Sequence, residues 1–181
     1  MSFLKEFFKN KSEVGAVAPS SKRLGNKMYG GFDFDKAKCI VEFGPGTGVF
    51  TNEVLKRMRE DATLIIFETN PQFYDRLKAE INDDRAFIYN DSAEKVTEVI
   101  AEQGFKNADY IISSLPLAVF PKELKESILN ASIKALGKGG IYVQFQYSLN
   151  ALKLLKTKFS KVKLAFTAIN IPPAFVYKCE V

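Results

Sequence analysis

The chain has 181 residues, of which 46% are hydrophobic and 26% charged, and its formal net charge is +5. This composition is typical of one globular domain and excludes a disordered chain, a collagen and a coiled coil. The sequence contains no histidine, which excludes Ser-His-Asp and Cys-His nucleophile systems, HExxH metalloproteases and most zinc hydrolases. Uncharged runs such as 164–177 are shorter than the roughly 18 to 20 apolar residues of a membrane span.

The N-terminal segment is amphipathic when drawn as a helix. Charges at positions 5, 6, 9 and 11 interrupt any apolar core of a secretory signal, which predicts a cytoplasmic protein. One helical face carries four apolar residues with lysines around it, a pattern typical of a short helix lying on an anionic membrane: Phe3, Leu4, Phe7 and Phe8. Docking of this face on the body of the domain or on a second subunit remains the alternative, and the oligomeric state stays open.

Short apolar runs alternate with amphipathic segments from residue 39 onward. They predict strands at 39–43, 64–67, 86–89, 110–114 and 141–147, with helices at 51–60, from Pro71, after Ser92, from Pro121 and at 149–159. The runs 161–168 and 174–181 are joined by a connection too short for a helical crossover, so we expect them to be antiparallel. The predicted fold class is α/β: a doubly wound, Rossmann-like seven-stranded sheet, mostly parallel with one antiparallel strand. We expect a helical extension at 1–38 and a cofactor-binding domain at 39–181.

Basic residues are concentrated at the two ends of the chain. Residues 1–38 hold eight Lys or Arg against four Asp or Glu, and residues 150–181 hold six against one. This asymmetry indicates an anionic partner, either nucleic acid or a phospholipid surface, although a solvated basic surface gives the same pattern. The cysteines, Cys39 and Cys179, lack the spacing of a zinc site, and no metal is predicted.

A glycine-rich turn follows the first predicted strand. Gly44, Gly46 and Gly48 stand at alternate positions before a helix, which lets the backbone approach a ligand and leaves helix N–H groups free to meet it. Glu68 ends the second strand, where a carboxylate can accept hydrogen bonds from both ribose hydroxyls of a nucleoside. The alternative is a tight turn with Glu68 acting only as a helix cap.

Two further acidic residues distinguish this motif from the GxGxxG motif of dinucleotide-binding proteins. Glu42 lies two residues before the first glycine, and Asp91 and Ser92 follow the third strand. With the GxGxG spacing, this set resembles the class I S-adenosylmethionine-dependent methyltransferases; NAD is the second cofactor considered. The resemblance implies that the glycines line S-adenosylmethionine, that Glu42 lies near its methionine ammonium, that Glu68 holds the ribose and that Asp91, with Ser92, holds the adenine. A strand-end carboxylate for Glu42 and a helix cap for Asp91 and Ser92 remain the structural alternatives.

The loop after the fourth strand bears on the methyl acceptor. In relatives of the rRNA adenine dimethylase type this loop reads Asn-Leu/Ile-Pro-Tyr/Phe, whereas here Ser114 replaces the amide and Leu117 the aromatic, so a flipped base loses an acceptor and a stacking partner. The loop, residues 3–28, 143–147 and 170–174 together resemble the bacterial phospholipid N-methyltransferases, which methylate phosphatidylethanolamine. This resemblance implies that Ser113, Ser114 and Leu115 border the transferable methyl. It also implies that the turn of Ser20 and Ser21 closes over the methionine end of the cofactor.

Methyl transfer to an amine is an in-line displacement that needs an unprotonated nitrogen. Tyr147, at the end of the fifth strand, and Asn170, in the final hairpin loop, are the side chains expected to contact that amine. The leading hypothesis is an N-methyltransferase acting on the headgroup of a phosphatidylethanolamine-type phospholipid at the inner face of the membrane. An RNA adenine N-methyltransferase and an S-adenosylmethionine-binding module without catalysis are the alternatives.

Overall fold

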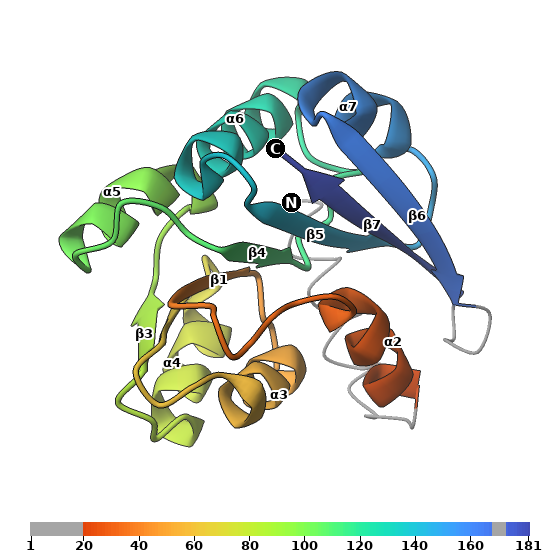
Figure 1. Ribbon diagram of the computed structural model, residues 1–181. Helices are drawn as coiled ribbons and strands as arrows, with labels where there is room; N and C mark the ends of the chain where they lie inside the picture. The colour runs from red at the N-terminus through yellow and green to blue at the C-terminus, as the bar shows by residue number, and fades with distance from the viewer. Residues whose placement is uncertain (1–19, 168–172) are drawn as a thin grey trace.

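The computed structural model describes residues 20–167 and 173–181, with side chains from Leu24 onward. Its described part contains one sheet of seven strands in the order β3-β2-β1-β4-β5-β7-β6 (Figure 1). The strands are β1 (Cys39–Phe43), β2 (Thr63–Phe67), β3 (Ala86–Tyr89), β4 (Tyr110–Ser113), β5 (Ile141–Gln146), β6 (Lys161–Thr167) and β7 (Ala174–Glu180). Strand β7 runs antiparallel to both β5 and β6, and the other pairings are parallel. The predicted fold class is therefore confirmed.

Helices cover both faces of this sheet (Figure 1). The helices are α2 (Ser20–Tyr29), α3 (Val49–Arg57), α4 (Pro71–Glu80), the 3-10 turn η1 (Ala93–Lys95), α5 (Val96–Glu102), α6 (Lys122–Leu136) and α7 (Leu152–Lys158). Helices α2, α3 and α4 lie on one face and α5, α6 and α7 on the other. Within the described ranges, no helix has both the length and the apolar character needed to cross a bilayer.

The central strand explains why the sequence shows continuous apolar runs. All five residues of β1 are buried, with Cys39, Val41 and Phe43 facing the α5–α7 layer and Ile40 facing the α2–α3 layer. A strand covered on both faces has no solvent side, so apolar and polar residues do not alternate along it. The outer strands β3 and β6 are only partly buried, as expected at the two sides of an open sheet.

The predicted extension packs into the sheet domain where the structure describes it. Leu24, Met28 and Tyr29 of α2 are buried in the core between α3 and the sheet. The amphipathic segment predicted at residues 3–11 lies outside the described residues.

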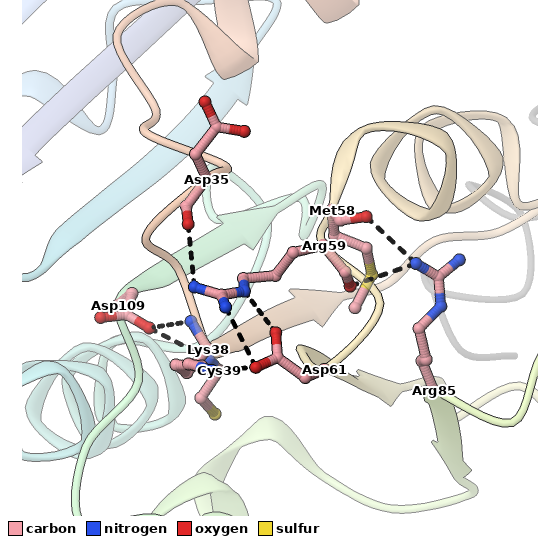
Figure 2. Close-up of polar contacts among 8 residues, drawn as sticks. All are labelled: Asp35, Lys38, Cys39, Met58, Arg59, Asp61, Arg85 and Asp109. Atoms are coloured by element: carbon pink, nitrogen blue, oxygen red, sulfur yellow. Dashed lines mark hydrogen bonds and ion pairs between the residues drawn. The ribbon is translucent and has the colours of Figure 1, made fainter.

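The amino edge of the sheet, where the parallel strands begin, is held by charged side chains. Asp109 Oδ2 accepts hydrogen bonds from the backbone N–H groups of Lys38 (2.7 Å) and Cys39 (3.0 Å), as Figure 2 shows. Nearby, the Arg59 guanidinium donates to the carbonyl of Asp35 at 2.9 Å and pairs with Asp61. These contacts tie the loop before β1 to β4 and to the loop before β2.

Arg85 caps the C-terminal end of α3 (Figure 2). Its guanidinium donates to the carbonyls of Leu55 (2.9 Å), Met58 (3.1 Å) and Arg59 (3.2 Å). It also forms a two-point ion pair with Asp83, at 2.6 and 2.9 Å. A cation at this position satisfies carbonyls that the helix leaves unpaired and opposes the negative end of its dipole.

Candidate functional site

The glycine turn lies at the carboxyl edge of the sheet, between β1 and α3. Gly44 and Gly48 have φ of +63° and +75°, in the left-handed region that favours glycine. A Cβ at Gly44 would also come within 2.9 Å of Leu115 Cδ2, so a side chain here would displace the loop after β4. The strand order changes direction between β1 and β4, and open α/β sheets bind ligands at that crevice.

Glu68 is fixed against this turn by backbone donors. Its Oε2 accepts a hydrogen bond from Gly46 N at 3.2 Å, and its Oε1 accepts one from Asn70 N at 2.8 Å. The residue is 1% exposed, yet it lines a cavity of about 260 Å³. These two hydrogen bonds fix the carboxylate in place beside the cavity.

This first cavity has polar residues on one side and apolar residues on the other. It is lined by Gly44, Phe67, Glu68, Thr69, Asp91, Ser92, Ala93, Ser114, Leu115, Pro116, Phe120, Leu124 and Ile128. Two carboxylates near a glycine turn, opposite an apolar wall from α6 and the loop before it, fit a nucleoside with a flat base. The cavity thus brings together Gly44, Glu68, Asp91 and Ser92 as expected from the sequence.

Asp91 and Ser92 line the cavity and also form the predicted caps. Asp91 Oδ1 accepts from Ser92 N at 2.7 Å, and Oδ2 pairs with Lys95 Nζ at 2.7 Å. The hydrogen bond from Lys95 lowers the pKa of the Asp91 carboxyl, which keeps it ionised and able to accept. Ser92 Oγ accepts from Glu94 N at 3.3 Å and so caps the turn η1.

Glu42 lies on the other face of the sheet. It is fully buried and accepts a hydrogen bond from Thr51 Oγ1 of α3 at 2.7 Å. Burial raises the pKa of the Tyr29 hydroxyl, and the charge of Glu42 raises it further. Glu42 is not among the residues that line the first cavity, so the structure does not bring it together with Glu68 and Asp91.

A second cavity of about 160 Å³ adjoins the first. It is lined by Ser114, Leu115, Pro116, Ala118, Val119, Phe145, Gln146, Tyr147 and Ser148, and the first three of these also line the first cavity. Tyr147 is 46% exposed and lies edge-on to Phe145 with ring centroids 5.5 Å apart, so it is not a core tyrosine. The loop after β4 therefore separates two adjoining spaces.

The polar groups of this loop differ in how fully they are paired. Ser114 is 7% exposed, and no described residue forms a hydrogen bond with its Oγ. The Leu115 carbonyl accepts from Leu117 N (2.9 Å), Gln144 Nε2 (3.0 Å) and Gln146 Nε2 (2.8 Å). This carbonyl has no capacity left for a ligand, whereas the Ser114 hydroxyl retains all of its own.

The side chain of Ser113 lies in the core of the fold and outside both cavities. It is fully buried, accepts a hydrogen bond from Leu115 N at 3.4 Å and contacts Tyr142, whose hydroxyl donates to Gln144 Oε1 at 2.7 Å. Neither cavity includes Ser113 among its lining residues. The sequence analysis missed Gln144 and Gln146, although two glutamines at alternate positions of an apolar strand are a signal, because buried amides need partners.

Three of the predicted site residues cannot be placed. Helix α2 begins at Ser20, but the side chains of Ser20 and Ser21 lie outside the described residues, as does Asn170. Among the described residues, no group of three or more His, Cys, Asp or Glu side chains could hold a metal ion.

No family model matches the chain. It is 28% identical over 180 residues to an ornithine lipid N-methyltransferase of Singulisphaera acidiphila, an alignment that covers 98% of this chain and 94% of the relative. Among solved structures, the N-methyltransferase NodS of Bradyrhizobium japonicum WM9 with S-adenosylhomocysteine superposes with a TM-score of 0.70 at 11% identity, covering 91% of this chain and 89% of NodS. The chain has the class I methyltransferase fold.

Another solved structure shares this fold at a similar level. A putative rRNA methylase of Clostridium thermocellum has a TM-score of 0.66 at 16% identity, with 92% of this chain and 98% of that chain covered. The resemblance to lipid N-methyltransferases and the predicted enzyme class, an S-adenosylmethionine-dependent N-methyltransferase, are confirmed by the curated relative. Two of the solved neighbours, NodS and PigF, contain S-adenosylhomocysteine, the product that S-adenosylmethionine leaves after methyl transfer, which agrees with the predicted cofactor.

Proposed function

We propose that this protein transfers a methyl group from S-adenosylmethionine to the amine of a membrane lipid headgroup of the phosphatidylethanolamine or ornithine lipid type. The observation that carries the proposal is the second cavity, which shares Ser114, Leu115 and Pro116 with the first and opens beside exposed apolar side chains. The similarity to an ornithine lipid N-methyltransferase along nearly the whole chain supports it.

The residues of the first cavity fit this cofactor. Glu68 would accept from the ribose hydroxyls, Asp91 from the adenine amino group, and Phe120, Leu124 and Ile128 would cover the base. When bound, the cofactor supplies an activated methyl group on a positively charged sulfur. Ser92 would act through the position of Asp91.

The second cavity would hold the acceptor nitrogen. The lining there is largely apolar, with Leu115, Pro116, Ala118, Val119 and Phe145. Desolvation disfavours an ammonium ion and favours the neutral amine, which has the lone pair needed for attack. The shared residues Ser114, Leu115 and Pro116 would place this nitrogen beside the methyl group that S-adenosylmethionine supplies, and the proton left on the methylated nitrogen would leave to water.

A set of half-exposed apolar side chains continues from the mouth of the second cavity along the end of β6. We call it the apolar rim; it consists of Val119, Tyr147, Leu149, Leu164 and Phe166, each 39% to 50% exposed. The sheet links the strand β6 to the cavity: Leu164 pairs in register with Tyr177, whose hydroxyl donates to the carbonyl of Ser148, a residue of the second cavity.

Charge at the apolar rim supports a lipid surface as the partner. Lys27 Nζ donates to the carbonyl of Phe166 at 2.7 Å, and residues 150–181 hold six basic residues against one acidic residue. Apolar side chains with lysines among them bind anionic bilayers peripherally. Within this proposal residues 1–38 form an extension that covers the cofactor and faces the membrane; the structure describes 20–38 of it.

Fractionation of transferred label tests the proposed reaction. Purified protein is incubated with methyl-labelled S-adenosylmethionine and vesicles that contain phosphatidylethanolamine or ornithine lipid, with phosphatidylglycerol vesicles and bulk RNA as parallel acceptors. We expect label in an amine lipid, and none from the Glu68→Ala variant. Label in RNA would instead support the RNA methyltransferase, and cofactor binding with no label in any fraction would support a binding module.

Vesicle sedimentation tests the apolar rim. The double variant Leu164→Ser, Phe166→Ser should bind anionic vesicles about tenfold more weakly, because each side chain loses apolar area from the lipid contact. Phe87→Ser is the matched control, since Phe87 is 38% exposed on β3 at the opposite side of the sheet. Equal binding by the double variant and the control would remove the apolar rim from the proposal.

A further inference from the structure

Gln146 is held in one orientation by two backbone carbonyls. Its Nε2 donates to Leu115 O at 2.8 Å and to Phe145 O at 2.8 Å, which uses both amide hydrogens. Exchanging the amide nitrogen and oxygen would place Oε1 against two carbonyl oxygens, so the hydrogen-bond network fixes which atom is which.

The other end of this amide carries an acceptor. Gln146 is 6% exposed and lines the second cavity, and no described residue forms a hydrogen bond with its Oε1. Ser114 Oγ, also buried and without a partner in the described chain, lines the same cavity. A buried hydroxyl oxygen without a partner, such as Ser114 Oγ, is rare in folded proteins unless a ligand or water pairs with it.

Gln144 provides an internal comparison. Its Nε2 donates to the same carbonyls, Leu115 O at 3.0 Å and Phe145 O at 2.8 Å. Its Oε1, however, accepts from the Tyr142 hydroxyl at 2.7 Å, and Gln144 does not line the second cavity. The two glutamines therefore support the loop after β4 in the same way, but only Gln146 offers an acceptor to a substrate.

We infer that Gln146 Oε1 accepts a hydrogen bond from an N–H of the substrate amine, with Ser114 Oγ as a second acceptor, and that this pair orients the nitrogen for methyl transfer. The inference rests on the proposed function and specifies how the amine is recognised. With its hydrogens on two fixed acceptors, a primary amine has its lone pair confined to one direction.

Acceptors of N–H groups discriminate amines by their degree of methylation. A neutral primary amine has two N–H groups, a monomethylated amine one and a dimethylated amine none. Loss of the Gln146 acceptor should therefore slow the first methylation most and the last methylation least.

The test compares Gln146→Met with Gln144→Met on vesicles that carry the primary, monomethyl or dimethyl headgroup. Both variants lose donors to Leu115 O, so any effect through the loop appears in both. We expect Gln146→Met to lower kcat/KM about five- to tenfold on the primary amine and less than twofold on the dimethylated one. Gln144→Met should affect all headgroups by one common factor. Affinity for S-adenosylhomocysteine, measured by calorimetry, should stay within twofold of wild type in both variants.

A uniform loss across headgroups in Gln146→Met, or identical profiles in the two variants, would overturn the inference. Ser114→Ala is the second variant, because Ser114 Oγ has no partner to lose and its removal should not disturb folding; it should show the same dependence on N–H number. Binding of the three headgroups to the S-adenosylhomocysteine complex gives the same ranking without turnover. A wild-type protein that methylates no amine lipid would refute the proposed function itself, whereas an active wild type with a flat Gln146→Met profile refutes only the role of Gln146.

Discussion

The two edges of the sheet use polar side chains in opposite ways. At the amino edge, the Arg85 guanidinium is paired with three carbonyls and the Asp83 carboxylate. Asp109 accepts two backbone hydrogen bonds there, as Figure 2 shows. At the carboxyl edge, Ser114 Oγ and Gln146 Oε1 line a cavity with no hydrogen bond from the described chain.

This difference separates stability from ligand binding along the strands. A polar atom buried without a partner, such as Ser114 Oγ, lowers the free energy of unfolding unless a ligand or water pairs with it. Paired groups at the amino edge stabilise the fold, and they do not line either of the two cavities described above. Substitutions at the carboxyl edge should therefore change ligand affinity, and substitutions at the amino edge should change the free energy of unfolding.

The largest expected effect is at the carboxyl edge. Glu68→Ala should weaken binding of S-adenosylhomocysteine by about a hundredfold or more, because two hydrogen bonds to a charged acceptor are lost. Isothermal titration calorimetry measures this directly. Glu80→Gln, on the exposed side of α4, is the surface control. Wild-type affinity in Glu68→Ala would show that the first cavity is not the cofactor site.

Arg85→Ala should have the converse effect at the amino edge. It leaves the terminal carbonyls of α3 and the Asp83 carboxylate without their donor, so the free energy of unfolding should fall by about 2 kcal/mol and Tm by roughly 4 to 8 °C. Affinity for S-adenosylhomocysteine, measured well below the new Tm, should stay within twofold of wild type. Arg85→Lys should recover part of the loss because it keeps the charge but not the planar fork.

Acidic pH should remove the contribution of the Asp83 carboxylate to this network, an effect smaller than that of Arg85→Ala. The hydrogen bond from Arg85 holds the pKa of the Asp83 carboxyl below its usual value. A carboxyl with a lowered folded-state pKa stabilises the protein above the unfolded pKa of about 3.9, and this stabilisation is lost as the pH falls through the folded pKa. Urea unfolding should thus show Asp83→Asn less stable than wild type at pH 7 by about 1 kcal/mol or less, since the pair is partly exposed. A difference that persists unchanged at pH 2 would contradict this account.

The sequence was sufficient for the fold because its signals are local. Apolar runs located β1 and β3 to the residue, and β4 and β5 end one residue before the predicted ends. The short connection predicted the antiparallel pairing of β6 and β7. These features depend on neighbours in the chain, which a sequence shows directly.

Only part of the candidate site could be predicted from local sequence signals. Glycine turns and strand-end carboxylates carry local signals, so the position of Glu68 could be predicted. Gln144 and Gln146 are visible as polar residues in an apolar strand, but the Leu115 carbonyl to which both donate lies 29 and 31 positions away, so the sequence does not show that they share it. Arg85 is a further example, because its carbonyl partners in the last turn of α3 and just after it precede it by 26 to 30 positions. Glu42 was predicted at the site because it is close to the glycine turn in sequence. That position does not indicate on which face of the sheet its side chain lies.

Thiol labelling compares the two edges in one experiment. Burial raises the pKa of Cys39 and of Cys179 to about 12, and both are fully buried, so native protein at pH 8 should resist a thiol reagent. Cys39 begins β1 at the amino edge, where Asp109 holds its N–H. Labelling therefore reports opening of the structure, and Arg85→Ala should accelerate labelling about thirtyfold if opening follows the lost 2 kcal/mol.

Saturating S-adenosylhomocysteine, bound at the other edge, should slow labelling of both cysteines by the factor that its affinity sets, because the ligand stabilises the whole folded state. If the ligand left the labelling rate of Cys39 unchanged, the amino edge would open on its own and the two edges would be separate cooperative units.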